Sequence, residues 1–174
     1  MIGMARLIYC AVAGLLLLPC RQPKKAGSKN QVSVNQSLLD SLKKESDSIY
    51  SKPYFASGFT RAEYIVNKKD SSITQVMKDS SGMIRQVVII KNKQRIYTAQ
   101  YYANGQLKGS YALDKFGQYN GAAEEYFENG FVREGGYYRG GLRTGIWKMY
   151  DSAGRYTSST EYDKNGQAIK TFRE

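Results

Sequence analysis

The sequence predicts an all-β protein: an extended, twisted, open antiparallel β-meander of hairpin repeats, with a short N-terminal helix. Three observations lead to this prediction. From Phe55 onward, short runs rich in β-branched and aromatic residues alternate with turn residues. The turns recur at steps of 10 to 13 residues, and no run carries a helix-length apolar pattern. Short strands at such regular spacing are typical of hairpins that follow one another along the chain.

The turns between the runs use glycine, asparagine and aspartate, which tolerate the backbone conformations of tight hairpins. The nine turn markers are Asp70, Gly82, Asn92, Gly105, Gly117, Gly130, Gly141, Gly154 and Gly166. Nine turns separate about ten short strands, so we expect a sheet of hairpins over residues 54–174.

Pairs of hairpin strands form a longer unit with a period of 24 residues. Gly117, Gly121 and Tyr126 recur as Gly141, Gly145 and Tyr150, and Tyr102 precedes Tyr126 by the same interval. The best-preserved copy contains Trp147 between Gly145 and Tyr150. The residues that define the repeat are therefore Tyr102, Gly105, Gly117, Gly121, Tyr126, Gly130, Gly141, Gly145, Trp147, Tyr150 and Gly166.

This pattern resembles the variant form of the MORN repeat (membrane occupation and recognition nexus), in which tyrosine, glycine and tryptophan recur at these spacings. The resemblance is specific over residues 101–166 and weaker over residues 55–100. It implies hairpins stacked into a twisted open sheet. It also implies a bacterial protein, since members of this group, including a branch loosely labelled antitoxin-like, are commonly small and exported.

The aromatic side chains, which include 15 tyrosines and Trp147, have two interpretations. In the first, they form ladders that hold neighbouring hairpins together, with rings lying over the bare backbone of nearby glycines. In the second, they form an exposed strip along a concave face of the sheet, suited to a glycan or an extended peptide. The stacking of hairpins favours the first interpretation.

The first 19 residues are predicted to be a signal peptide. They carry one charge, Arg6, and an apolar run from Leu7 to Pro19, which is shorter than the roughly 20 residues that a membrane-spanning helix needs. The run ends in Leu-Leu-Pro-Cys, which resembles a bacterial lipobox, although Pro19 replaces the usual small residue. We expect a lipid on Cys20 and attachment to the cell envelope, periplasmic or surface-facing. Without that lipid, the protein would be secreted or would keep the segment as an uncleaved anchor.

Two further segments precede the predicted sheet. Residues 20–36 are basic and lack a hydrophobic pattern, which indicates a flexible tether that anionic lipid would attract. Residues 37–52 are predicted to be a short amphipathic helix, capped by Ser37 and ended by Pro53. Its apolar side comprises Leu38, Leu39, Leu42 and Ile49. We expect this helix to cover the first strand of the sheet, and the alternative is a partner-binding helix.

Composition excludes several classes of site. The chain has a net charge of +11 and contains no histidine, and its only cysteines are Cys10 and Cys20. A Cys/His metal site and an imidazole-based catalytic triad are therefore excluded, and we predict no metal and no cofactor. The basic charge favours anionic surfaces such as lipid headgroups, polyanionic glycans or acidic proteins.

The acidic group at Glu124, Glu125 and Glu128 is the candidate for acid–base chemistry. Glu124 and Glu125 are adjacent in a predicted strand, so they should point to opposite faces and not act as a pair. Lys91, Lys93 and Arg95 lie near tyrosines, as in some nucleic-acid surfaces. Export argues against a nucleic-acid partner, and lysine-rich strands are common protection against edge pairing. We predict no catalytic residues.

These observations favour a membrane-tethered, non-enzymatic binding or scaffold module of the bacterial cell envelope. Its partner would be a protein or an envelope glycan. One alternative is an antitoxin-like inhibitor of a protein partner. Another is an enzyme that acts on envelope glycans through the acidic group.

Overall fold

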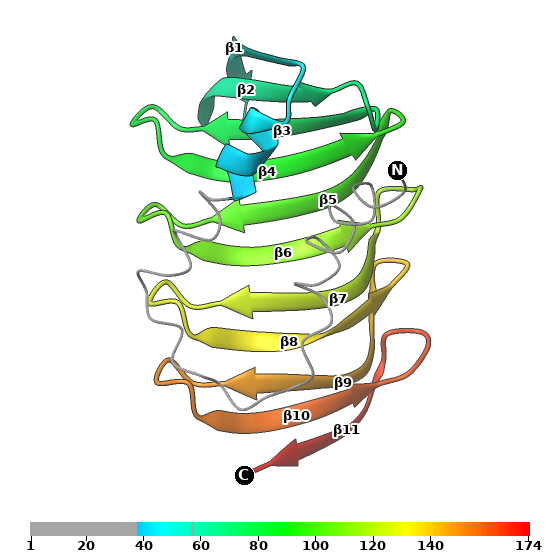
Figure 1. The fold of residues 1–174 in the computed structure, drawn as a ribbon. Helices are drawn as coiled ribbons and strands as arrows, with labels where there is room; N and C mark the ends of the chain where they lie inside the picture. The colour runs from blue at the N-terminus through cyan, green and yellow to red at the C-terminus, as the bar shows by residue number, and fades with distance from the viewer. Residues whose placement is uncertain (1–37, 57) are drawn as a thin grey trace.

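Eleven antiparallel strands follow one another in a single open sheet, and each is hydrogen-bonded to its neighbours in sequence (Figure 1). The computed structural model describes residues 38–56 and 58–174. The predicted signal peptide and the whole predicted tether, including Cys20, lie outside these residues. The strands are β1 (Ser48–Ala56), β2 (Phe59–Asn67), β3 (Ser72–Lys78), β4 (Ile84–Lys91), β5 (Gln94–Tyr101), β6 (Leu107–Leu113), β7 (Tyr119–Tyr126), β8 (Val132–Arg139), β9 (Leu142–Tyr150), β10 (Tyr156–Tyr162) and β11 (Ala168–Arg173). The predicted open β-meander is confirmed.

The predicted helix over residues 37–52 is wrong in its second half. Helical residues are 38–44, and Ser48 already begins β1, so the sheet starts earlier than residue 54. Ile49 pairs with Ile65 across β1 and β2 instead of extending the apolar side of the helix. Pro53 does not end a helix. It lies inside β1, and this is possible because β1 is an edge strand, where the missing N–H costs no bond within the sheet.

The chain therefore has one more strand than the turn markers indicate. The additional connection joins β1 and β2 around Gly58, which has a φ of 80°. This connection precedes the first of the nine predicted markers. It was not predicted because residues 37–52, which include the start of β1, were assigned to the helix. All nine predicted turns connect consecutive strands.

Most of the turns share one five-residue structure. In the turn at residues 114–118, the Asp114 amide donates to the Gln118 carbonyl at 2.9 Å, and the Gly117 amide donates back to Asp114 at 3.0 Å. The Asp114 carboxylate accepts two further bonds, from the amides of Phe116 and Gln118. Turns that begin at Asp79, Asp151 and Asp163 repeat this arrangement, and those that begin at Tyr102 and Phe127 repeat its backbone bonds.

Three turns on one rim of the sheet are joined into a ladder. The Asn104 side chain donates to the Glu128 carbonyl at 3.0 Å, and the Asn129 side chain donates to the Ser152 carbonyl at 2.7 Å. The Tyr102 hydroxyl donates to the Tyr126 carbonyl at 2.8 Å. These bonds join residues 23 or 24 positions apart, so the period read from the sequence is also the period of the structure.

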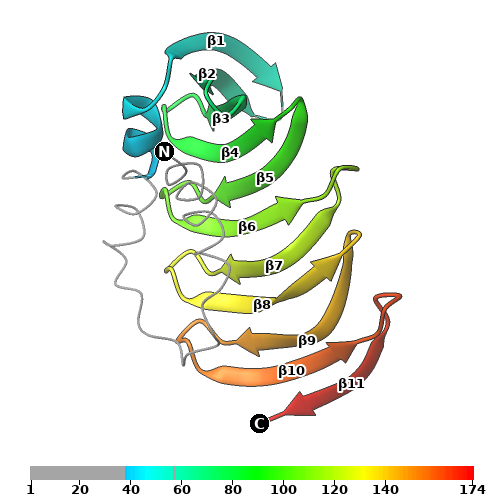
Figure 2. The same cartoon turned by 45° about the vertical axis from the view of Figure 1, so that its right-hand side comes forward.

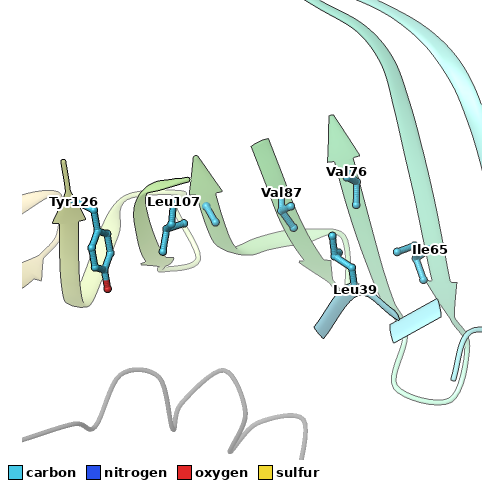
Figure 3. Packing of buried hydrophobic residues seen from close by; sticks show 7 residues of the cluster. Leu39, Ile65, Val76, Val87, Leu107 and Tyr126 are labelled. Atoms are coloured by element: carbon cyan, nitrogen blue, oxygen red, sulfur yellow. The ribbon is translucent and has the colours of Figure 1, made fainter. Parts of the chain in front are cut away.

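The helix at residues 38–44 packs on one face of the sheet, which we call the helix face (Figures 1 and 2). Leu39 is buried there among Ile65, Val76 and Val87 (Figure 3). Lys43 forms a 2.6 Å ion pair with Glu63 of β2, which fastens the helix. The prediction that the helix covers the first strand is therefore wrong. The helix covers a face of the sheet that several strands form. An aliphatic side chain gains more from contact with several strands than from contact with one edge.

The opposite face carries most of the aromatic contacts, and we call it the aromatic face. Its members in the first half of the sheet include Ala62, Met77 and Val88, which pack together. Val87 and Val88 are adjacent in β4 and both buried, one on each face. Both faces of this continuously apolar strand are therefore covered.

A candidate binding face

The aromatic face of β6 to β10 carries a continuous stack of rings. Tyr111 and Tyr119 stack with centroids 4.3 Å apart, and Tyr138 meets Trp147 edge-on at 4.9 Å. The Arg143 guanidinium lies 4.1 Å from the Trp147 ring centroid. Rings and guanidinium cover one another in these geometries, which are the favourable ones for aromatic and cation–π pairs.

Trp147 is the centre of this stack. Its side chain is fully buried, and its indole N–H donates to the Tyr137 carbonyl at 3.1 Å. A β-carbon added at Gly136 would lie 2.6 Å from the indole ring, so only glycine leaves room for it. A ring therefore lies over bare backbone, as the ladder interpretation predicts. Trp147 contributes packing and offers no surface to a ligand.

The other repeat-defining residues occupy turns, bulges and packed positions. Seven glycines have positive φ, between 65° and 119°, and they are Gly105, Gly117, Gly121, Gly130, Gly141, Gly145 and Gly166. Gly121 and Gly145 lie in strands, each where the pairing register shifts. Tyr126 is buried on the helix face, whereas Tyr150 contacts Tyr156 edge-on at 6.1 Å. Cys20, the predicted lipid-attachment residue, lies outside the described residues.

Beside the ring stack, one row of polar side chains crosses several strands. Gln86 faces Gln100, Gln100 faces Gly109, Gly109 faces Glu125, and Glu125 faces Glu134. Residues that face each other across paired strands project from the same face of a sheet. The row therefore presents amides over β4 and β5 and carboxylates over β7 and β8.

Arginines neutralise the carboxylate end of the row. Arg133 bonds to Glu125 and also to Glu134, and Arg143 bonds to Glu134 at 2.8 Å. The Tyr111 hydroxyl donates to Glu125 at 2.8 Å. Burial, together with this bond to a carboxylate, raises the pKa of Tyr111. The cluster is an internally paired network, which suits recognition of polar groups better than proton transfer.

Glu124 points away from this network, which confirms that Glu124 and Glu125 lie on opposite faces. Its carboxylate accepts a 2.6 Å bond from the Tyr126 hydroxyl on the helix face. Burial and the adjacent Glu124 charge raise the pKa of Tyr126. Among the described residues, no group of three or more His, Cys, Asp or Glu side chains is arranged to hold a metal ion.

Two pairs in this row do not follow from the sequence: Glu134 faces Glu125, and Gln86 faces Gln100. Both pairs depend on β-bulges, where one strand has an extra residue. Each bulge shifts the register by one residue and so decides which side chains share a face. The sequence carries a partial signal of the bulges on one rim, because the bulge residues Arg85, Lys108 and Arg133 recur at intervals close to 24.

No protein-family model and no curated protein sequence matches this chain. Among solved structures, the chain is similar to a mutant of TarM from S. aureus in complex with Fondaparinux, alpha-GlcNAc-glycerol and UDP, with 10% identity and a TM-score of 0.35. That match covers 62% of this chain and 24% of TarM. A second similar structure is accessory secretory protein 1,2 and 3 in Streptococcus pneumoniae, with 11% identity, a TM-score of 0.34, and coverage of 75% and 23%. The chain thus spans about a quarter of either structure. Likeness at these scores carries no argument about function.

Proposed function

We propose that this protein is a membrane-tethered, non-enzymatic binding or scaffold module of the bacterial cell envelope. The observation that supports the proposal is the different use of the two faces of the sheet. The helix face receives the helix at residues 38–44, the first described element after the predicted tether. The aromatic face carries the polar row and the ring stack over successive hairpins. The helix thus occupies one face, and in this proposal the other face is left to meet a ligand.

The chemistry of the aromatic face suits an extended polar ligand. Amides, carboxylates and guanidinium groups lie in a row beside partly exposed rings, and neighbouring strands lie about 4.8 Å apart. A glycan or an extended peptide could place its polar groups along such a row. The ion pairs of Glu125 and Glu134 favour binding over catalysis, because a carboxylate held by a guanidinium is a poor general acid.

The tether is tested by mass spectrometry of the protein extracted from bacterial membranes. We expect cleavage before Cys20 and a diacylglyceryl modification on that residue. The matched variant is Cys20→Ser, which should lose the lipid and leave the membrane fraction. An unmodified N-terminus on the membrane-bound wild-type protein would contradict the tether.

The binding role is tested by presenting the full-length wild-type protein, in detergent, to a glycan array and to envelope extracts. Arg143→Gln is the informative variant, because it removes a guanidinium from both Glu134 and Trp147. Arg173→Gln, an exposed residue of the edge strand, is the matched control. We expect a bound glycan or a stoichiometric protein that Arg143→Gln weakens and Arg173→Gln does not. Capture of nothing by either route would overturn the binding role.

A further inference from the structure

Three bulges on one rim of the sheet each place a basic residue at the same structural position. Arg85, Lys108 and Arg133 are the extra residues of the bulges between β3 and β4, β5 and β6, and β7 and β8. The intervals between them are 23 and 25 residues, so three successive repeats each contribute one cation, whereas the next bulge on this rim, between β9 and β10, carries the uncharged Thr157. Successive cations lie two strand spacings apart, which corresponds to roughly 10 Å. This row belongs to the repeat and is not a chance cluster of surface charge.

The environments of two of these cations differ in one informative way. Arg133 lies between Glu125 and Glu134, which both bond to it. The positions that flank Lys108 in the same register are held by Gln100 and Gly109. Neither of these residues carries a charge. Lys108 is exposed, its ammonium lies 5.9 Å from the Tyr102 ring centroid, and among the described residues it forms no salt bridge. Carboxylates of the same repeat therefore pair with Arg133, whereas no carboxylate occupies the equivalent positions beside Lys108.

A hollow of about 350 Å³ lies beside Lys108. It is lined by Gly58, Phe59, Asp79, Arg85, Gln86, Gln100, Tyr101 and Lys108. Its volume is at the lower end of the range for small-molecule sites, about 300–1,000 Å³. The hollow thus combines two cations, two amides and the ring of Phe59 in a space suited to one small unit of a ligand, whereas the Tyr101 side chain packs on the helix face.

Asp79 is the one residue with a carboxylate that lines the hollow, and one of its oxygens is hydrogen-bonded within its own turn. The Asp79 carboxylate accepts bonds from the Ser81 hydroxyl at 2.6 Å and from the amides of Ser81 and Met83. These bonds, the Ser81 hydroxyl first, lower the pKa of Asp79 and keep it ionised. Arg85 is 3.9 Å from it, a long ion pair that leaves most of the guanidinium donors available. The remaining charge of the hollow is positive.

The amides supply the other half of the recognition. Gln86 donates to Thr98 at 3.1 Å, which orients its side chain and leaves its carbonyl oxygen as an acceptor. Gln100 faces Gln86 directly and forms no side-chain hydrogen bond among the described residues. Paired amides can donate to and accept from neighbouring hydroxyl groups, and aromatic residues pack on the C–H groups of a sugar ring.

We propose that this hollow binds an acidic sugar unit, meaning a pyranose that carries a carboxylate or a phosphate. Lys108 and Arg85 hold the acidic group, Gln86 and Gln100 hold the ring hydroxyls, and Phe59 contributes the apolar wall. The inference rests on the proposed binding function and names its ligand class. A glycan that continues from this unit would follow the polar row towards β7 and β8.

The test is NMR titration of the full-length protein in detergent micelles, with isotope-labelled glutamine side chains. The probes are D-glucuronate, D-glucose 6-phosphate and neutral D-glucose. We expect the side-chain amide signals of Gln86 and Gln100 to shift with at least one acid and not with glucose. A response to glucuronate alone, to the phosphate alone or to both identifies the acid, and each supports the site. No response to either acid, or an equal response to glucose, would overturn it.

Two variants and a control make the test specific. Lys108→Gln should weaken the binding of the acid by up to about fivefold, the upper end of the usual loss for an exposed charge pair. Gln100→Glu places a carboxylate beside Lys108, as Glu125 lies beside Arg133, and should abolish binding. Lys164→Gln, an exposed lysine in a turn on the opposite rim, should leave affinity unchanged. Equal affinity in all three variants would contradict the proposal.

The outcome is separable from that of the proposed function. The lipid on Cys20 and the capture of a protein partner do not depend on the hollow. Failure of the sugar titration with a lipidated, partner-binding protein would remove this inference alone. Acid binding by a protein that is not lipidated would leave the hollow standing and remove the tether.

Discussion

The first and second halves of the sheet use the same hairpins but bury their side chains in different ways. In β2 to β4 the buried residues are largely aliphatic, and a helix supplies a second layer over Ile65 and Val76. In β6 to β10 the buried cluster is aromatic, and the rings of Tyr138 and Tyr162 pack on Trp147 from within the sheet. Trp147 is nevertheless the most completely buried large side chain of the described residues.

The difference shows what a sheet of one layer requires. Short aliphatic side chains reach across strands less well than aromatic ones, and on the helix face the helix adds a second layer over them. Aromatic side chains can lie flat over a glycine in the next strand and cover each other. Gly136 beneath Trp147 is the clearest case. The second half of the sheet can therefore dispense with a second layer.

The largest effect should come from Trp147→Ala, which removes the centre of the aromatic cluster. We expect the free energy of unfolding to fall by about 3–5 kcal/mol, as is usual for a fully buried aromatic residue. Chemical denaturation followed by circular dichroism measures the loss. The control is Ile146→Ala, whose side chain is 56% exposed on the other face. If both variants lose the same small amount, the ring stack does not stabilise this half.

A smaller and local effect is expected from Leu39→Ala, which removes the main contact of the helix with the sheet. The loss should be about 2–3 kcal/mol, because a short helix relaxes more readily than a strand inside a sheet. Hydrogen exchange should show faster opening of β2 to β4 and unchanged protection of β8 to β10. Leu38→Ala, at a residue 36% exposed, is the matched control. Equal acceleration in both halves would mean that the sheet opens as one unit.

The smallest expected effect is the acid dependence of helix attachment. Burial opposes ionisation of Glu63, but its hydrogen bond to Lys43 and the charges of Lys78 and Lys43 outweigh burial and lower its pKa. A carboxyl with a lowered folded pKa stabilises above its unfolded pKa, about 4.3, and loses this as the pH falls through the folded value. The contribution should be at most about 1 kcal/mol, because the pair is partly exposed.

Amide exchange in the helix at residues 38–44 measures this contribution. The protection factors of these amides, which allow for the slower intrinsic exchange in acid, should fall below about pH 4 in the wild-type protein. Glu63→Gln should exchange faster at neutral pH and respond less to acid. Asp79 and Asp151 also have lowered pKa values, through bonds within their turns, and they serve as the common background of both proteins. An unchanged acid response in the variant would show that Glu63 does not hold the helix.

The prediction of the fold succeeded where the signal was local. Asp114 and Gly117, for example, form a turn from bonds within five residues, and such turns depend little on the rest of the protein. The prediction failed at β1, where Leu38 to Tyr50 carries enough helical periodicity to hide a strand. Edge pairing with β2 decided that segment, because a strand gains its hydrogen bonds from a distant partner.

By itself, the sequence determined the class of fold, the period of the repeat and the separation of Glu124 from Glu125, since each follows from local turns or from alternation along a strand. Only the tertiary structure decided that Glu134 meets Glu125 and that Lys108 stands beside Gln100. It also decided that the helix covers a face of the sheet. The physical reason is that bulges set the pairing register, and a shift of one residue moves a side chain to the other face.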